Sequence, residues 1–123
     1  MSLVNRVLPG NLAGNEISDA NVVGGTAPIL GKDGATTIFA VYLDNSAGSG
    51  DAYLRIWDAT SGKTSGTNPA HYIFYAPGNS TRMYTIPLGL TIDFGILYIG
   101  ANAAGNSGST GPSTTLQTRI LIT

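Results

Sequence analysis

The sequence contains no cysteine, a single histidine and a single glutamate among its 123 residues. Without cysteine, neither a disulfide nor a thiolate metal site can form, and one histidine is a poor basis for a transition-metal site. No run of about 18 apolar residues is present, so we expect no membrane-spanning helix. The first residues lack the basic start and apolar stretch of a signal peptide.

Charged residues are also scarce, at 11% of the chain against about 25% in an average soluble domain. The formal net charge of −1 provides no basic field that would attract nucleic acid or an anionic membrane. The composition is instead rich in Gly (17), Thr (14), Ser (10) and Asn (9). A surface of hydroxyl, amide and bare backbone groups is typical of extracellular, virion or heavily assembled proteins.

Helical periodicity is almost absent, because Gly or Pro interrupts every window in which apolar residues recur at helical spacing. Short strand-like runs separated by turn residues are frequent, and this pattern is typical of sandwiches and barrels. We predict one domain over residues 1–123, formed by about eight strands in an antiparallel two-sheet sandwich of jelly-roll or immunoglobulin-like topology. Residues 1–33 are expected to form edge strands or an N-terminal arm. The expected strands are residues 36–43, 52–57, 71–76, 80–86, 90–93, 95–101 and 116–122, with weaker signals at 3–8 and 22–30.

Motifs that could support catalysis or phosphate binding are incomplete. Gly62-Lys63-Thr64 resembles the end of a P-loop, but the glycine required five positions earlier is Trp57. His71 has no nucleophile elbow in the sequence to accompany it, and most acidic residues adjoin predicted turns, where Asp caps local backbone N–H groups. We therefore predict a non-enzymatic protein without a cofactor.

Oxygen-rich side chains flank one turn, and this arrangement raises the alternative of a calcium site. Asp44, Asn45 and Asp51 lie on either side of a glycine-rich segment, and Ca²⁺ prefers such hard oxygen ligands. Their spacing matches no known calcium loop, so we predict no metal site here.

Aromatic residues in two neighbouring strands are the remaining candidates for binding. Tyr53, Arg55 and Trp57 share one strand face, opposite Leu54 and Ile56, which are expected to face the core. The next strand adds further aromatic side chains. These residues could be core, a subunit interface or a ligand platform, and the candidate interface or platform residues are Tyr53, Arg55, Trp57, Tyr72 and Tyr75.

The order of motifs from residue 36 to 122 resembles small β-sandwich proteins encoded among the structural genes of tailed bacteriophages and prophages. The resemblance rests on residues 53–58 (Tyr-Leu-Arg-Ile-Trp-Asp), 66–69 (Gly-Thr-Asn-Pro), 72–74, 87–90 (Pro-Leu-Gly-Leu) and 95–99. Two features depart from the family pattern: Trp57 replaces the usual aromatic residue, and Phe94-Gly95-Ile96 stands where Thr-Gly-Leu is usual.

The resemblance implies a non-enzymatic structural or assembly protein of a virion, such as a head decoration, fibre or tail accessory piece. Such a protein would contact other virion proteins and form a homo-oligomer, with a trimer expected for a spike or fibre. It would be found in the virion, or outside the cell after host lysis. The alternative from the aromatic residues is a carbohydrate- or surface-binding sandwich module with glycans as partners.

Overall fold

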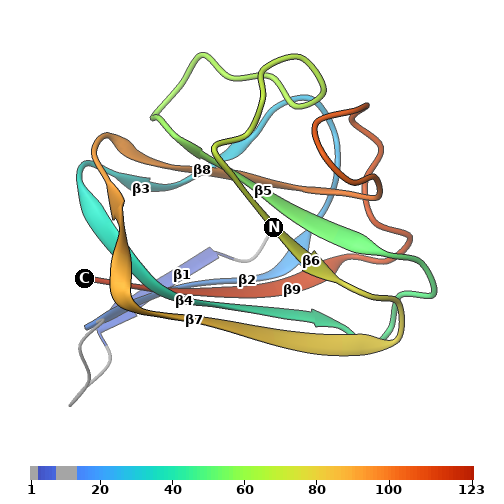
Figure 1. Cartoon of the computed structure of the whole chain (residues 1–123), viewed down its shortest axis with the longest axis horizontal. Helices are drawn as coiled ribbons and strands as arrows, with labels where there is room; N and C mark the ends of the chain where they lie inside the picture. Colours follow the sequence, from blue (N-terminus) through green and yellow to red (C-terminus); the bar gives the residue numbers. More distant parts are fainter. Residues whose placement is uncertain (1–2, 8–13) are drawn as a thin grey trace.

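The computed structural model describes the backbone of residues 3–7 and the whole of residues 14–123, and these residues form two antiparallel sheets packed face to face (Figure 1). The strands are β1 (Leu3–Val7), β2 (Asn15–Val22), β3 (Ile29–Asp33), β4 (Thr36–Asn45), β5 (Ala52–Asp58), β6 (Tyr72–Ala76), β7 (Ser80–Ile92), β8 (Gly95–Ala101) and β9 (Leu116–Ile122). Sheet A has the strand order β1-β2-β9-β4-β7, and sheet B has the order β3-β8-β5-β6.

The strand pairing is nested along the chain: β2 pairs with β9, β3 with β8, β4 with β7, and β5 with β6. Nested pairing means that the chain runs out and back as one long hairpin, which is then wrapped over two sheets of four strands. This is the strand order of a jelly roll, with β1 added at the edge of sheet A beside β2. The fold is therefore the predicted all-β sandwich, and the strand order distinguishes it from the immunoglobulin arrangement.

The core lies between the sheets and is formed by alternate residues of the strands. In β9, residues 116, 118, 120 and 122 are buried while 117 and 119 are exposed, as expected for a strand that covers a core with one face. A polar contact lies within this core, where the buried Tyr98 hydroxyl donates to Asp19 Oδ2 at 2.6 Å. The contact joins β8 of sheet B to β2 of sheet A, and burial raises the pKa of Tyr98.

The first third of the chain differs from the sequence prediction. A strand at residues 22–30 was expected, but residues 23–28 form a loop, and strands lie on either side of it. The prediction missed β2 because its buried residues include Glu16 and Asp19 as well as Ile17 and Val22, and buried acidic residues do not produce an apolar pattern. β1 covers most of the strand expected at 3–8, and Leu8 lies outside the described residues.

The runs expected at 80–86 and 90–93 belong to one long strand, β7. Its register against β4 breaks between Ile38 and Ala40, so residues 86–89 form an insertion opposite Phe39. Gly89 has a φ of 79°, a backbone conformation that glycine adopts without strain. The Pro and Gly that predicted an interruption therefore mark an irregularity inside an edge strand.

Candidate functional site

The outer face of sheet B carries four of the five residues predicted as an interface or ligand platform, three from β5 and Tyr75 from β6. Tyr53, Arg55 and Trp57 point away from the core, while Leu54 and Ile56 face it as predicted. The loops at residues 59–71 and 102–115 lie on this outer side of sheet B (Figure 1). They cover Arg55 and Trp57 completely, since both side chains are 0% exposed. The expectation of an accessible platform therefore does not hold for these two residues.

Arg55 fastens the two covering loops to the sheet. Its Nη1 donates to Ser65 Oγ at 2.8 Å and to the Gly108 carbonyl at 2.6 Å, and its Nη2 donates to the Ser107 carbonyl at 3.0 Å. All three acceptors are neutral, and burial lowers the pKa of the guanidinium. An arginine stays charged in this setting, so Arg55 is a buried cation stabilised by carbonyl and hydroxyl dipoles.

Trp57 forms a second small core on the same face. It packs with Leu97 and Ile99 of β8, and Ala59 and Ala70 of the covering loop lie against this cluster. The indole Nε1 donates to the Asn68 carbonyl at 3.1 Å. The loop at residues 59–71 thus covers the apolar cluster of Trp57, Leu97 and Ile99. This cover explains why a tryptophan lies on the outward face of the strand.

Tyr53 and Tyr75 are half-buried at the end of sheet B that the loops leave open. Their rings stack with centroids 5.1 Å apart, and the Tyr75 hydroxyl donates to Asp51 Oδ1 at 3.2 Å. Tyr72 packs against the main core from the inner side of β6. The structure thus separates the five predicted residues into two buried under loops, one against the core and two in a surface stack.

The turn that raised the calcium alternative is held by its own side chains. Asn45 is buried, and its Nδ2 donates to the carbonyl oxygens of Gly50, Ala76 and Pro77. Asp44 accepts the Ser46 backbone N–H at 2.9 Å. A side-chain hydrogen bond and a backbone hydrogen bond from Ser46 lower the pKa of Asp44. Among residues 14–123, no group of three His, Asp or Glu side chains is placed to hold a metal ion.

His71 and Asp58 also have structural partners. His71 Nδ1 accepts the backbone N–H of Asp58 at 2.8 Å. The Asp58 carboxylate accepts the backbone N–H groups of Asp93, Phe94 and Gly95, which form the turn between β7 and β8. Burial alone would raise the pKa of Asp58, but these three hydrogen bonds together with the nearby His71 lower it. The carboxylate therefore caps a turn.

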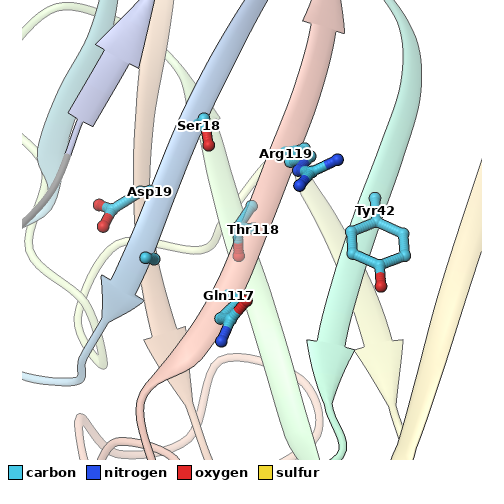
Figure 2. Close-up of a pocket in the computed structure, with 7 residues that line it drawn as sticks. Ser18, Asp19, Tyr42, Gln117, Thr118 and Arg119 are labelled. Carbon is cyan, nitrogen blue, oxygen red and sulfur yellow. The ribbon is translucent and has the colours of Figure 1, made fainter.

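The outer face of sheet A is open and hollowed. A row of side chains crosses four strands in register: Ser18 of β2 lies opposite Arg119 of β9, Arg119 opposite Tyr42 of β4, and Tyr42 opposite Met83 of β7. Figure 2 shows Ser18, Arg119 and Tyr42 on three neighbouring strands. The Arg119 guanidinium carbon lies 5.7 Å from the centre of the Tyr42 ring, within the range of a cation–π contact.

Two depressions adjoin this row. The larger, of about 370 Å³, is lined by Glu16, Tyr42, Met83, Arg119 and Leu121. The smaller, of about 110 Å³, is lined by residues 18–20, Tyr42 and residues 117–119. Tyr42 and Arg119 belong to both, so they form the ridge between them. The Asp19 side chain is not a polar group of the hollow, because its carboxylate is buried against Tyr98.

Sequence reasoning did not single out Tyr42 or Arg119. The alternation in residues 116–122 already indicates that Arg119 points outward, since its neighbours Thr118 and Ile120 belong to the buried set. Which residues lie beside it depends on the pairing of β9 with β2 and β4, strands that are far away in the chain. That register is tertiary information.

Comparison of the chain with protein-family models, with curated proteins and with solved structures finds no match. The described part of the chain contains no helix with the length and apolarity needed to cross a membrane.

Proposed function

We propose that this protein is a non-enzymatic structural or assembly component of a phage or prophage particle and that it works as a homo-oligomer, with a trimer as the expected state. The sequence order over residues 36–122 that resembles phage structural proteins supports this proposal. The jelly-roll strand order supports it as well, because this fold recurs in viral capsid proteins. The observation that carries it is the exposure of large apolar side chains along one edge of the sandwich.

Leu88 and Phe94 are the two most exposed large apolar residues of this edge. Among the strands that the structure describes, β7 pairs only with β4, so its other side is an open sheet edge. The insertion at residues 86–89 leaves Leu88 98% exposed, and Phe94 in the adjoining turn is 67% exposed. Each such side chain contributes about 1.5–3 kcal/mol when it is fully buried. An open strand edge with apolar side chains favours association with another chain.

The rest of the surface fits repeated contacts between subunits. Serine, threonine and asparagine are abundant and charges are few. Hydroxyl and amide groups can form hydrogen bonds across an interface without burying unpaired charge. The same chemistry serves both contacts between copies and contacts with other virion proteins.

Light scattering on the purified protein tests the proposal, with Leu88→Asp and Phe94→Asp as variants. We expect the wild type to have about three times the 12.6 kDa mass of one chain, and each variant to shift the mass toward the monomer, because a carboxylate would be placed in an apolar contact. Leu30→Asp is the matched control, since Leu30 is 40% exposed on β3, at an edge of sheet B. A monomeric wild type, or equal loss of mass with the control, contradicts this assignment of the edge.

The alternative of a carbohydrate-binding module is supported by another surface than the aromatic residues that the sequence indicated. Arg55 and Trp57 are buried, so they do not support it. The hollow beside Tyr42 and Arg119 does, because it combines an aromatic ring with hydrogen-bonding side chains on an open face.

A further inference from the structure

The hollow on sheet A is built on strands, which hold its side chains in fixed relative positions. β9 lies between β2 and β4 and is hydrogen-bonded to both, so Arg119 projects from the middle of a continuous sheet. Its contact with Tyr42 orients the guanidinium above an aromatic ring. Sites on regular elements hold their geometry more closely than sites on loops, and this one needs no loop to close over it.

The polar groups at the hollow suit a ligand with many hydroxyl groups. Arg119 offers several N–H donors in a planar fork, Gln117 offers both a donor and an acceptor, and the Ser18 hydroxyl can do either. Gln117 and Arg119 are exposed, so their groups are available to a ligand.

The charges at the larger depression favour a neutral ligand. Its described lining includes one cation, Arg119, and one carboxylate, Glu16. An anionic ligand would meet repulsion from Glu16, and a cationic ligand would meet repulsion from Arg119. Neutral hydroxyl groups avoid both costs and can accept hydrogen bonds from the exposed Arg119.

The apolar part of the hollow matches the C–H face of a sugar ring. Tyr42 contributes its ring, and Met83 and Leu121 line the larger depression with it. Met83 is 56% exposed, so a ligand would cover apolar surface that now faces water. The volume of about 370 Å³ falls at the small end of ligand sites, which are about 300–1,000 Å³, and suits one or two sugar units.

We propose that the open face of sheet A is a saccharide-binding site for a neutral sugar, in which Tyr42 packs against the ring and Arg119, Gln117 and Ser18 hydrogen-bond to its hydroxyl groups. The site goes beyond the assembly role and does not rest on it, because Leu88 and Phe94 line neither depression. A particle protein with such a site would attach to a glycan-bearing surface.

Titration followed by NMR on the full chain tests the site. The probes are neutral trisaccharides of glucose, galactose, mannose and N-acetylglucosamine, together with a trisaccharide of galacturonic acid. We expect at least one neutral probe to shift the amide signals of residues 117–121 and 40–44 at millimolar concentration. Arg119→Ala should weaken that binding about tenfold or more, because hydrogen bonds to charged groups are among the stronger polar contacts.

Matched variants distinguish this site from the rest of the surface. Arg82→Ala removes an exposed arginine of β7 that lines neither depression and should leave binding unchanged. Tyr53→Ala removes a ring of the other surface pair and should also leave it unchanged. Gln117→Ala, at an exposed position, provides a second test if Arg119→Ala folds poorly, and should weaken binding severalfold.

Three results would overturn the proposal. The first is the absence of any shift with every neutral probe. The second is binding that Tyr53→Ala removes and that Arg119→Ala and Gln117→Ala leave intact. The third is binding of the galacturonic acid probe alone. None of these results depends on oligomeric mass, so failure of the saccharide site and failure of the assembly proposal can be told apart.

Discussion

The two outer faces of the sandwich differ in how their outward side chains are covered. On sheet A, β9 alternates between buried and exposed residues. On sheet B, β8 is buried at every position and β5 at five of its seven, because the loops at 59–71 and 102–115 cover their outer side (Figure 1). Sheet B is therefore covered on both faces, by sheet A on the inside and by the loops on the outside. Sheet A is covered only on its inner face, and its outer face is exposed to solvent. The comparison indicates that sheet B carries stability and sheet A is free to carry binding.

Removal of the Trp57 side chain from the covered outer face of sheet B should lower the free energy of unfolding most. Trp57→Ala removes the indole from its cluster with Leu97 and Ile99 and removes the hydrogen bond to Asn68. We expect a loss of about 3–5 kcal/mol in the free energy of unfolding. Urea unfolding followed by circular dichroism measures it, because Trp57 is the only tryptophan and the variant has no comparable fluorescence.

Trp57→Phe is the control for this experiment. It keeps most of the apolar contact but loses the N–H donor, so its cost should be markedly smaller than that of the alanine variant. A loss below about 1 kcal/mol for Trp57→Ala would mean that the loops do not cover this face in solution.

Arg55→Met should have the next largest effect. The substitution keeps an apolar stem but leaves the Ser107 and Gly108 carbonyls and the Ser65 hydroxyl without their donor. We expect a loss of about 2–4 kcal/mol, since unsatisfied buried polar groups cost about 1–3 kcal/mol each and part of the loop can reach water instead. Trypsin cleavage after Lys63, within the loop, should also become faster. Unchanged cleavage with unchanged stability would contradict the role of Arg55 as the fastening of the loops.

Asp58→Asn should cost about 1 kcal/mol at neutral pH, because a carboxylate that accepts backbone N–H groups becomes a neutral amide. The pKa of Asp58 is lower in the folded protein than its ordinary value of 3.8. A lowered carboxyl pKa contributes stability that is fully present above the ordinary value and is lost as the pH falls through the folded pKa. Unfolding measured below about pH 4 should therefore lose stability more steeply in the wild type than in Asp58→Asn. Parallel pH profiles for the two proteins would count against this turn cap.

A substitution on the open outer face of sheet A should change the free energy of unfolding least. Arg119→Met mirrors Arg55→Met in chemistry but removes an exposed cation–π contact with Tyr42, which contributes about 0.5–1 kcal/mol at exposed sites. We expect a change below about 1 kcal/mol in the same urea experiment and no change in cleavage after Lys63. A loss equal to that of Arg55→Met would remove the distinction between the two faces.

Local patterns were sufficient for four strands in the last two thirds of the chain. Residues 36–43, 52–57, 95–101 and 116–122 were expected as strands and are found in β4, β5, β8 and β9. The pattern failed for β2, where the buried Asp19 accepts hydrogen bonds from Tyr98 of the opposite sheet and from the backbone N–H of Asn21. A buried polar residue gives no apolar signal in its own strand.

The residues of the candidate site were predicted less well than the strands. The outward direction of Tyr53, Arg55 and Trp57 was predicted, but the loops that cover Arg55 and Trp57 were not, because a loop rich in Gly, Ser and Thr has no local signature of where it packs. Tyr42 and Arg119 lie opposite each other on neighbouring strands, although they are 77 positions apart in the sequence. Strand alternation predicts the face of each residue but not its neighbour.

The sequence by itself determined the all-β class, the low charge of the surface and the inward direction of Leu54 and Ile56, because these follow from composition and a two-residue period. Tertiary structure decided the jelly-roll order, the cover over Arg55 and Trp57 and the Tyr42–Arg119 row. The physical reason is that strand register and loop packing depend on hydrogen bonds and contacts between residues far apart in the chain, and no short segment contains both partners.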